Sequence, residues 1–171
     1  MRTLHIVDDS EKDRKIIVRL LEESWESNEG PPDLPEVKES DFIWELLEGS
    51  DLKTGDVVIA DLYPTEYWEK APPPKPIRVR PRPKDPTNFF NATVDMVERF
   101  LSKVPERGAE LIVMTYIPHF MERDIEVPIA GEKLRDLLES HRLILLEKEH
   151  QYEDEDCSRK AIEAANEVLS R

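Results

Sequence analysis

Short apolar runs alternate with segments of helical period along most of the chain. The apolar runs predict five strands, and the segments after them predict five helices. Strict alternation of this kind is typical of strand–helix units that build a parallel sheet. We therefore expect an α/β fold, a three-layer doubly wound domain; if its strand order is 2-1-3-4-5, the first and third strands are neighbours. The predicted strands cover residues 3–7, 36–39, 56–62, 111–115 and 143–146.

Each predicted helix carries its apolar residues on one face. Ser10 stands at the expected N-cap of the first helix, Gly49 is the expected C-cap of the second, and the third ends near Pro105 and Gly108. The apolar faces are Ile16, Ile17, Leu20 and Leu21; Phe42, Ile43, Leu46 and Leu47; Val94, Val97, Phe100, Leu101 and Val104; Leu134, Leu137 and Leu138; and Ile162, Ala165 and Leu169, the last within a helix over 161–169.

A proline-rich segment interrupts this alternation after the third strand. Residues 70–86 read KAPPPKPIRVRPRPKDP and hold seven of the fourteen prolines, with six basic residues against one acidic residue. Because proline fits neither a sheet interior nor a helix interior, we expect an exposed loop insert over about 64–90. It has three interpretations: a surface insert, a docking strand for an aromatic-lined groove, or an arm for acidic partners or RNA.

Length and charge narrow the class of protein. With 171 residues, 39% of them hydrophobic, the chain is expected to be a single domain over 1–171 with a sizeable core. Its net charge of −14 argues against binding of nucleic acid or of an anionic membrane by the chain as a whole. The basic insert and the acidic body together permit self-association as a homodimer.

The single cysteine and the lack of long apolar runs indicate where in the cell the protein is located. Cys157 alone cannot form an internal disulfide or a cysteine-based zinc site. No apolar segment is long enough for a signal peptide or a membrane span. We therefore expect a cytoplasmic protein.

Acidic residues stand at the ends of two predicted strands that should be neighbours. Asp8 and Asp9 follow the first strand, and Asp61 lies at the end of the third. Two such charges about 4 Å apart repel by roughly 4 kcal/mol at an effective dielectric near 20. A proton or a divalent cation must relieve that repulsion, and oxygen ligands with room for water suit Mg²⁺. The alternative for Asp8 and Asp9 is that they only cap the first helix.

Together with Thr115 and Lys148, at the ends of the fourth and fifth strands, this pattern resembles the receiver domains of two-component response regulators. The resemblance implies a flavodoxin-like, or CheY-like, fold with Asp61 as phosphoacceptor. It also implies a histidine kinase or phosphotransfer protein as the phosphoryl donor.

The resemblance further assigns a role to each residue of the site. Asp9, Asp61 and the backbone carbonyl of Tyr63 would ligate Mg²⁺, with Asp8 acting through water. Thr115 would donate its hydroxyl to a phosphoryl oxygen, and Lys148 would pair with the phosphoryl group.

The chain also departs from the family pattern around the last two strands. Glu149 stands directly after Lys148, where receivers usually carry proline, and Tyr116 follows Thr115, where the family prefers a small residue. Because Lys148 lies between two glutamates, its alternative interpretation is a solvated ion-pair ladder.

We expect a stand-alone receiver that signals through protein contacts, with no DNA-binding output domain after the last helix and an unknown downstream target. It would be a signalling module rather than an enzyme. One alternative is a receiver-like adaptor that never cycles phosphate. Another is a magnesium-dependent phosphohydrolase, although such enzymes usually carry a second aspartate at the position that Tyr63 occupies.

Overall fold

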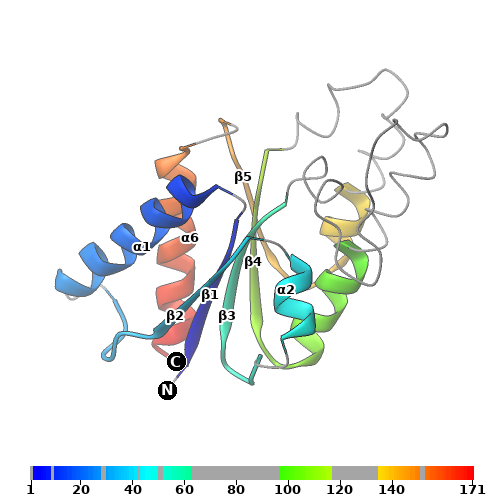
Figure 1. The fold of residues 1–171 in the computed structure, drawn as a ribbon, viewed down its shortest axis with the longest axis horizontal. Coiled ribbons are helices and arrows are strands. Elements are labelled where there is room, and N and C mark those ends of the chain that lie inside the picture. Colours follow the sequence, from blue (N-terminus) through cyan, green and yellow to red (C-terminus); the bar gives the residue numbers. More distant parts are fainter. Residues whose placement is uncertain are drawn as a thin grey trace.

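A computed structural model of the chain describes residues 2–8, 10–27, 30–41, 43–49, 52–62, 97–116, 135–150 and 153–171. Five strands form one parallel sheet in the order β2-β1-β3-β4-β5 (Figure 1). They are β1 Thr3–Val7, β2 Glu36–Ser40, β3 Val57–Asp61, β4 Glu110–Thr115 and β5 Ile144–Glu147. The predicted doubly wound fold and its strand order are confirmed, and the arrangement is flavodoxin-like.

Among the described residues, five helical segments connect or follow these strands. They are α1 Glu11–Glu26, α2 Ile43–Glu48, residues 97–106, residues 135–140 and α6 Glu155–Leu169. The last helix was predicted over 161–169 but begins at Glu155, because Asp154 caps a polar first turn that has no apolar period. The expected insert at about 64–90, together with Val94 and Leu134, lies outside the described residues.

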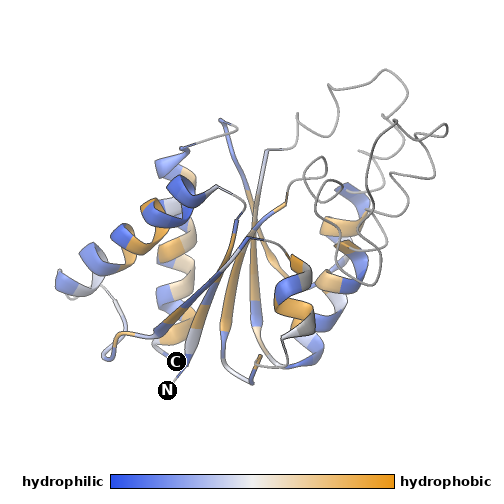
Figure 2. Ribbon diagram, in the orientation of Figure 1, coloured by the Kyte–Doolittle hydropathy of each residue, from blue (hydrophilic) through white to orange (hydrophobic). Residues whose placement is uncertain are grey.

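The helices cover both faces of the sheet, so the domain has three layers. In Figure 1, α1 and α6 lie together on one face, and α2 and the helix over 97–106 lie on the other. Side chains of β3 alternate between the two layers: Val57 and Ile59 pack with α1 and α6, whereas Val58 and Ala60 pack against the opposite helices. The hydrophobic colouring of the central strands in Figure 2 follows from this burial on both faces.

The register of the sheet brings the ends of the central strands to one edge. Val7 pairs with Ala60 and Asp61 with Met114, and Thr115 pairs with Glu147. The residues that end β1, β3, β4 and β5 therefore emerge at the same carboxyl edge, where ligands bind in open parallel sheets.

Gly108 makes a tight connection between the helix over 97–106 and β4. Its φ is +80°, and its carbonyl accepts a hydrogen bond from the amide of Gly55 at 2.9 Å. A Cβ at this position would lie 2.7 Å from Thr54 Oγ1 and 3.2 Å from Thr54 Cα. Both the backbone conformation and the space therefore require glycine.

We expect Gly108→Ala to lower the free energy of unfolding by about 1–3 kcal/mol, because alanine adds strain at positive φ. Urea denaturation of the purified variant measures the loss. Adding Thr54→Ala should recover only the part that comes from the contact with Thr54 Oγ1. An unchanged unfolding midpoint in Gly108→Ala would contradict the close packing described here.

No helix in the described part of the chain is long and apolar enough to cross a membrane.

Candidate functional site at the carboxyl edge of the sheet

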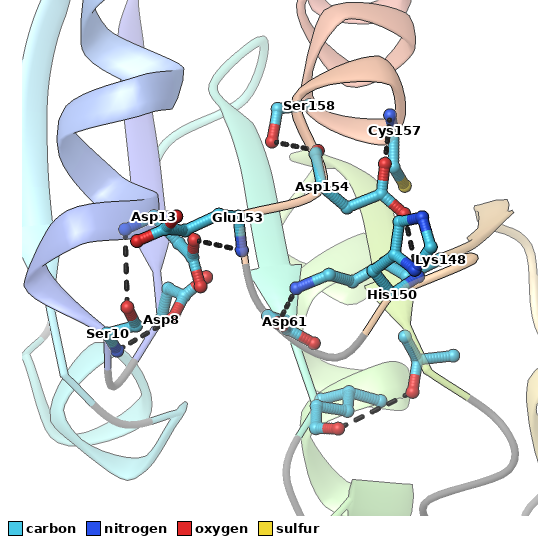
Figure 3. Close-up of polar contacts among 12 residues, drawn as sticks. Asp8, Ser10, Asp13, Asp61, Lys148, His150, Glu153, Asp154, Cys157 and Ser158 are labelled. Atoms are coloured by element: carbon cyan, nitrogen blue, oxygen red, sulfur yellow. Dashed lines mark hydrogen bonds and ion pairs between the residues drawn. The ribbon is translucent and has the colours of Figure 1, made fainter.

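A buried ion pair between Lys148 and Asp61 lies at the centre of this edge (Figure 3). Lys148 Nζ donates to Asp61 Oδ2 at 2.7 Å, and the two side chains are 2% and 0% exposed. The ladder interpretation of Lys148 is therefore wrong, because its ammonium points inward and not into solvent. The sequence pattern placed both residues, which lie 87 positions apart, at this edge of the sheet, and it did not predict their direct contact.

Burial favours the neutral form of both groups, whereas their pairing favours the charged form of both. Burial raises the pKa of Asp61 to about 6, and the attraction of the Lys148 ammonium limits the rise. Burial disfavours the charged form of Lys148, but the charge and hydrogen bond of Asp61 together with the charges of Asp8 and Asp13 outweigh it, so that the pKa of Lys148 is raised. At neutral pH, Lys148 thus keeps the Asp61 carboxylate ionised in a place where water does not solvate it.

Asp8 lies directly after β1 and is a second buried carboxylate of the site. It is 1% exposed, and its Oδ1 accepts the amide of Ser10 at 2.8 Å. Its Oδ2 has no hydrogen-bond partner among the described residues. Burial, reinforced by the charge of Asp61, raises the pKa of Asp8 to about 8. Asp8 therefore does more than cap the first helix, since half of its carboxylate faces the interior unsatisfied.

Asp13 is a third buried carboxylate, which the sequence pattern did not reveal. It lies in the first turn of α1, is 3% exposed and appears beside Asp8 in Figure 3. Its Oδ1 accepts the amide of Glu153 at 2.8 Å, and its Oδ2 has no partner in the described part of the chain. One signal was available: Asp13 stands one helical turn before Ile17, on the apolar face.

Thr115 ends β4 and is fully buried. Its hydroxyl donates to the carbonyl of Leu62 at 3.4 Å, so it ties β4 to the residue after Asp61. Tyr116, the next residue, is half-buried. The Thr115 hydroxyl thus lies at the predicted edge of the sheet, where it donates its hydrogen bond to the backbone carbonyl of Leu62.

Two residues of the expected magnesium site, Asp9 and Tyr63, lie outside the described residues. Within the described ranges, no group of three or more histidine, cysteine, aspartate or glutamate side chains is arranged to hold a metal ion. The buried Oδ2 atoms of Asp8 and Asp13 are nevertheless oxygen donors without partners, the kind of ligand that a hard cation takes. The donor chemistry of the site fits Mg²⁺.

No family model matches this chain, and a search of curated proteins finds no match. The case for function therefore rests on the site itself.

Proposed function

We propose that the chain is a receiver-type signalling domain that accepts a phosphoryl group on Asp61 with the help of Mg²⁺. The observation that carries the proposal is the Asp61–Lys148 pair, an aspartate at the end of β3 held at 2.7 Å by a lysine from the end of β5. Asp8, buried with an unpartnered oxygen, supplies the acidic surroundings.

Phosphoryl uptake would use the ionised form of Asp61. One carboxylate oxygen attacks the phosphorus of a phosphohistidine or an acyl phosphate, and a new O–P bond forms as the bond to the leaving group breaks. The leaving group keeps the electron pair of that bond. Lys148 is placed to transfer its ammonium from the carboxylate to a phosphoryl oxygen, a stronger acceptor with more charge. Mg²⁺ held by the site carboxylates would neutralise charge on the phosphoryl group.

A direct test is incubation with acetyl phosphate and Mg²⁺, followed by measurement of the intact mass. We expect one phosphoryl adduct in the wild-type protein and none in Asp61→Asn. Asp156→Asn is the matched control, because Asp156 is an exposed carboxylate 79% open to solvent and should leave the adduct unchanged. Chelation of the metal with EDTA should abolish uptake in the wild type.

The same experiment decides between the proposal and its alternatives. The full burial of the Asp61 side chain also fits an adaptor that binds partners without cycling phosphate, and absence of an adduct at every metal concentration would favour it. Steady release of phosphate from a phosphomonoester would favour a phosphohydrolase. An adduct that persists in Asp61→Asn would refute Asp61 as the acceptor.

A further inference from the structure

The backbone directly after Lys148 is held by a carboxylate that has no place in the proposed chemistry. Asp154 Oδ2 accepts the amides of Glu149 at 2.7 Å and His150 at 3.2 Å. Its Oδ1 accepts the amide of Cys157 at 3.0 Å and so caps α6. The two oxygens of one side chain therefore serve separate purposes, as Figure 3 shows in part.

These contacts are strong enough to fix the backbone. Asp154 is only 7% exposed, and although burial opposes its charge, the three amides lower its pKa below the ordinary value. Amides that donate to a charged acceptor form bonds roughly twice as strong as those to a neutral one. On the other side, the amide of Lys148 itself donates to the carbonyl of Thr115 at 2.8 Å. Three successive amides, from Lys148 to His150, are therefore tied to fixed acceptors.

The long side chain of Lys148 makes such fixation necessary. A lysine side chain has about 2 kcal/mol of rotamer entropy to lose when it is held in one conformation. Its ammonium reaches Asp61 in one buried geometry only if its backbone stays in place. Glu149 has no proline ring to restrict this backbone, and its amide forms the shortest of the contacts to Asp154.

A second contact holds the same segment from the other side. Glu153 adopts a φ of +53°, unusual for a residue with a side chain, and its amide donates to Asp13 Oδ1. Its carboxylate pairs with Lys12 at 2.9 Å on the surface. The segment between β5 and α6 is thus attached to α1 as well as to α6.

We propose that Asp154 is a positioning residue for the lysine of the site: its Oδ2 holds the Glu149 and His150 amides so that Lys148 points at Asp61. The inference deepens the proposed function, since it assigns the residue that prepares Lys148 to meet a phosphoryl group. Asp154 would position Lys148 in the same way in the unphosphorylated protein.

Asp154→Ser separates the two roles of Asp154. Serine is as good an N-cap as aspartate, so its hydroxyl can accept the Cys157 amide and keep α6 intact. It has no second oxygen for Glu149 and His150. The matched control is Asp156→Ser, which removes a carboxylate from the same helical turn that makes no contact with these amides and pairs only with Lys160 at 3.0 Å among the described ion pairs.

The readout is the rate at which a small acylating reagent modifies Lys148, followed by mass spectrometry of its peptide. The exposed Lys160 serves as the internal reference, since its side chain is 61% open to solvent. In Asp154→Ser we expect Lys148 to react at least about tenfold faster than in the wild type, the change that follows from loss of one or two charge-assisted hydrogen bonds. Asp156→Ser should match the wild type.

Asp154→Ser should still unfold in one cooperative transition, with a midpoint lowered by the loss of the hydrogen bonds to Glu149 and His150. Cooperative unfolding distinguishes loss of positioning from loss of the fold. Equal protection of Lys148 in Asp154→Ser and wild type would overturn the proposal. If Asp154→Ser does not unfold cooperatively, Asp154→Thr, another capping residue, is measured in its place with the same two outcomes.

Phosphoryl uptake gives an independent measurement. Where the wild type forms an adduct, Asp154→Ser should take up phosphate more slowly, as Lys148→Met does, and Asp156→Ser should not. An unchanged rate beside increased acylation would overturn the link between positioning and uptake. Absence of an adduct in the wild type would count against the proposed function alone, because acylation of Lys148 does not require phosphate.

Discussion

Lys148→Met is expected to lower the free energy of unfolding by about 2–3 kcal/mol at pH 8, because Asp61 is left buried without its counter-ion and must take up a proton that the wild type has released above a pKa of about 6. Methionine keeps most of the length and apolar volume of the lysine stem, so the loss comes mainly from charge. Urea denaturation of the wild type and variant, with EDTA present, measures the difference.

The dependence on pH identifies the cause. Burial already raises the pKa of Asp61 to about 6 in the presence of Lys148, and removal of the ammonium must raise that pKa further. A group whose pKa is higher in the folded than in the unfolded state loses stability as the pH rises between the two values. The deficit of Lys148→Met should therefore be small at pH 5, where folded Asp61 is protonated, and should grow as the pH rises from 6 to 8.

The double variant Asp61→Asn/Lys148→Met provides the control. With both charges gone, no ion is left unpaired in the interior, and most of the loss should be recovered, because replacement of both members of a buried pair is often nearly neutral. A loss of equal size at pH 5 and pH 8, or no recovery in the double variant, would show that packing and not charge explains the effect.

The strands and their order were the features easiest to predict from the sequence. Because β3 is buried on both faces, it is a continuous apolar run. The residue that ends such a run in a parallel sheet lies at the carboxyl edge of the sheet. Asp61 and Lys148 could therefore be placed at the same edge of the sheet, but the ion pair between them was not predicted. The weakest strand candidate, at 36–39, also proved correct as β2, an edge strand with two of its five residues exposed and none buried.

Asp13 and Asp154 escaped prediction for a physical reason. Each is a polar residue whose partners are backbone amides distant in the chain or across a turn, and the type of a residue does not indicate such contacts. Asp154 lies in the acidic run that opens α6, where no apolar period marks the start of a helix. Only the fold shows that the amide of Glu153 meets a carboxylate 140 positions away.

Asp8→Asn is expected to stabilise the protein by about 2–4 kcal/mol at pH 8 in the absence of Mg²⁺, since one unit of pKa shift corresponds to about 1.4 kcal/mol and relaxation of the interior reduces the full effect. Asparagine keeps an oxygen for the Ser10 amide. Its amino group replaces the unpartnered Oδ2 and carries no charge that burial would oppose.

Asp8→Asn is expected to stabilise the protein because the pKa of Asp8 is raised, to about 8 in the folded protein against an ordinary value of 3.8. Between these values the folded protein holds a proton that the unfolded chain has released, so that the wild type loses stability as the pH rises from about 4 to about 8. Asparagine does not titrate, and the advantage of Asp8→Asn should be less than half as large at pH 5 as at pH 8.

Magnesium gives this experiment a second arm that bears on the proposed function. A cation that replaces the proton among Asp8 and its neighbours binds only the folded protein, and it should stabilise the wild type more as the pH rises. Asp8→Asn, with one carboxylate fewer, should gain less from Mg²⁺ at pH 8 than the wild type does. A variant less stable than the wild type at pH 8 in EDTA would mean that the Asp8 carboxylate has a partner that stabilises its charge, and the acidic pocket would need another explanation.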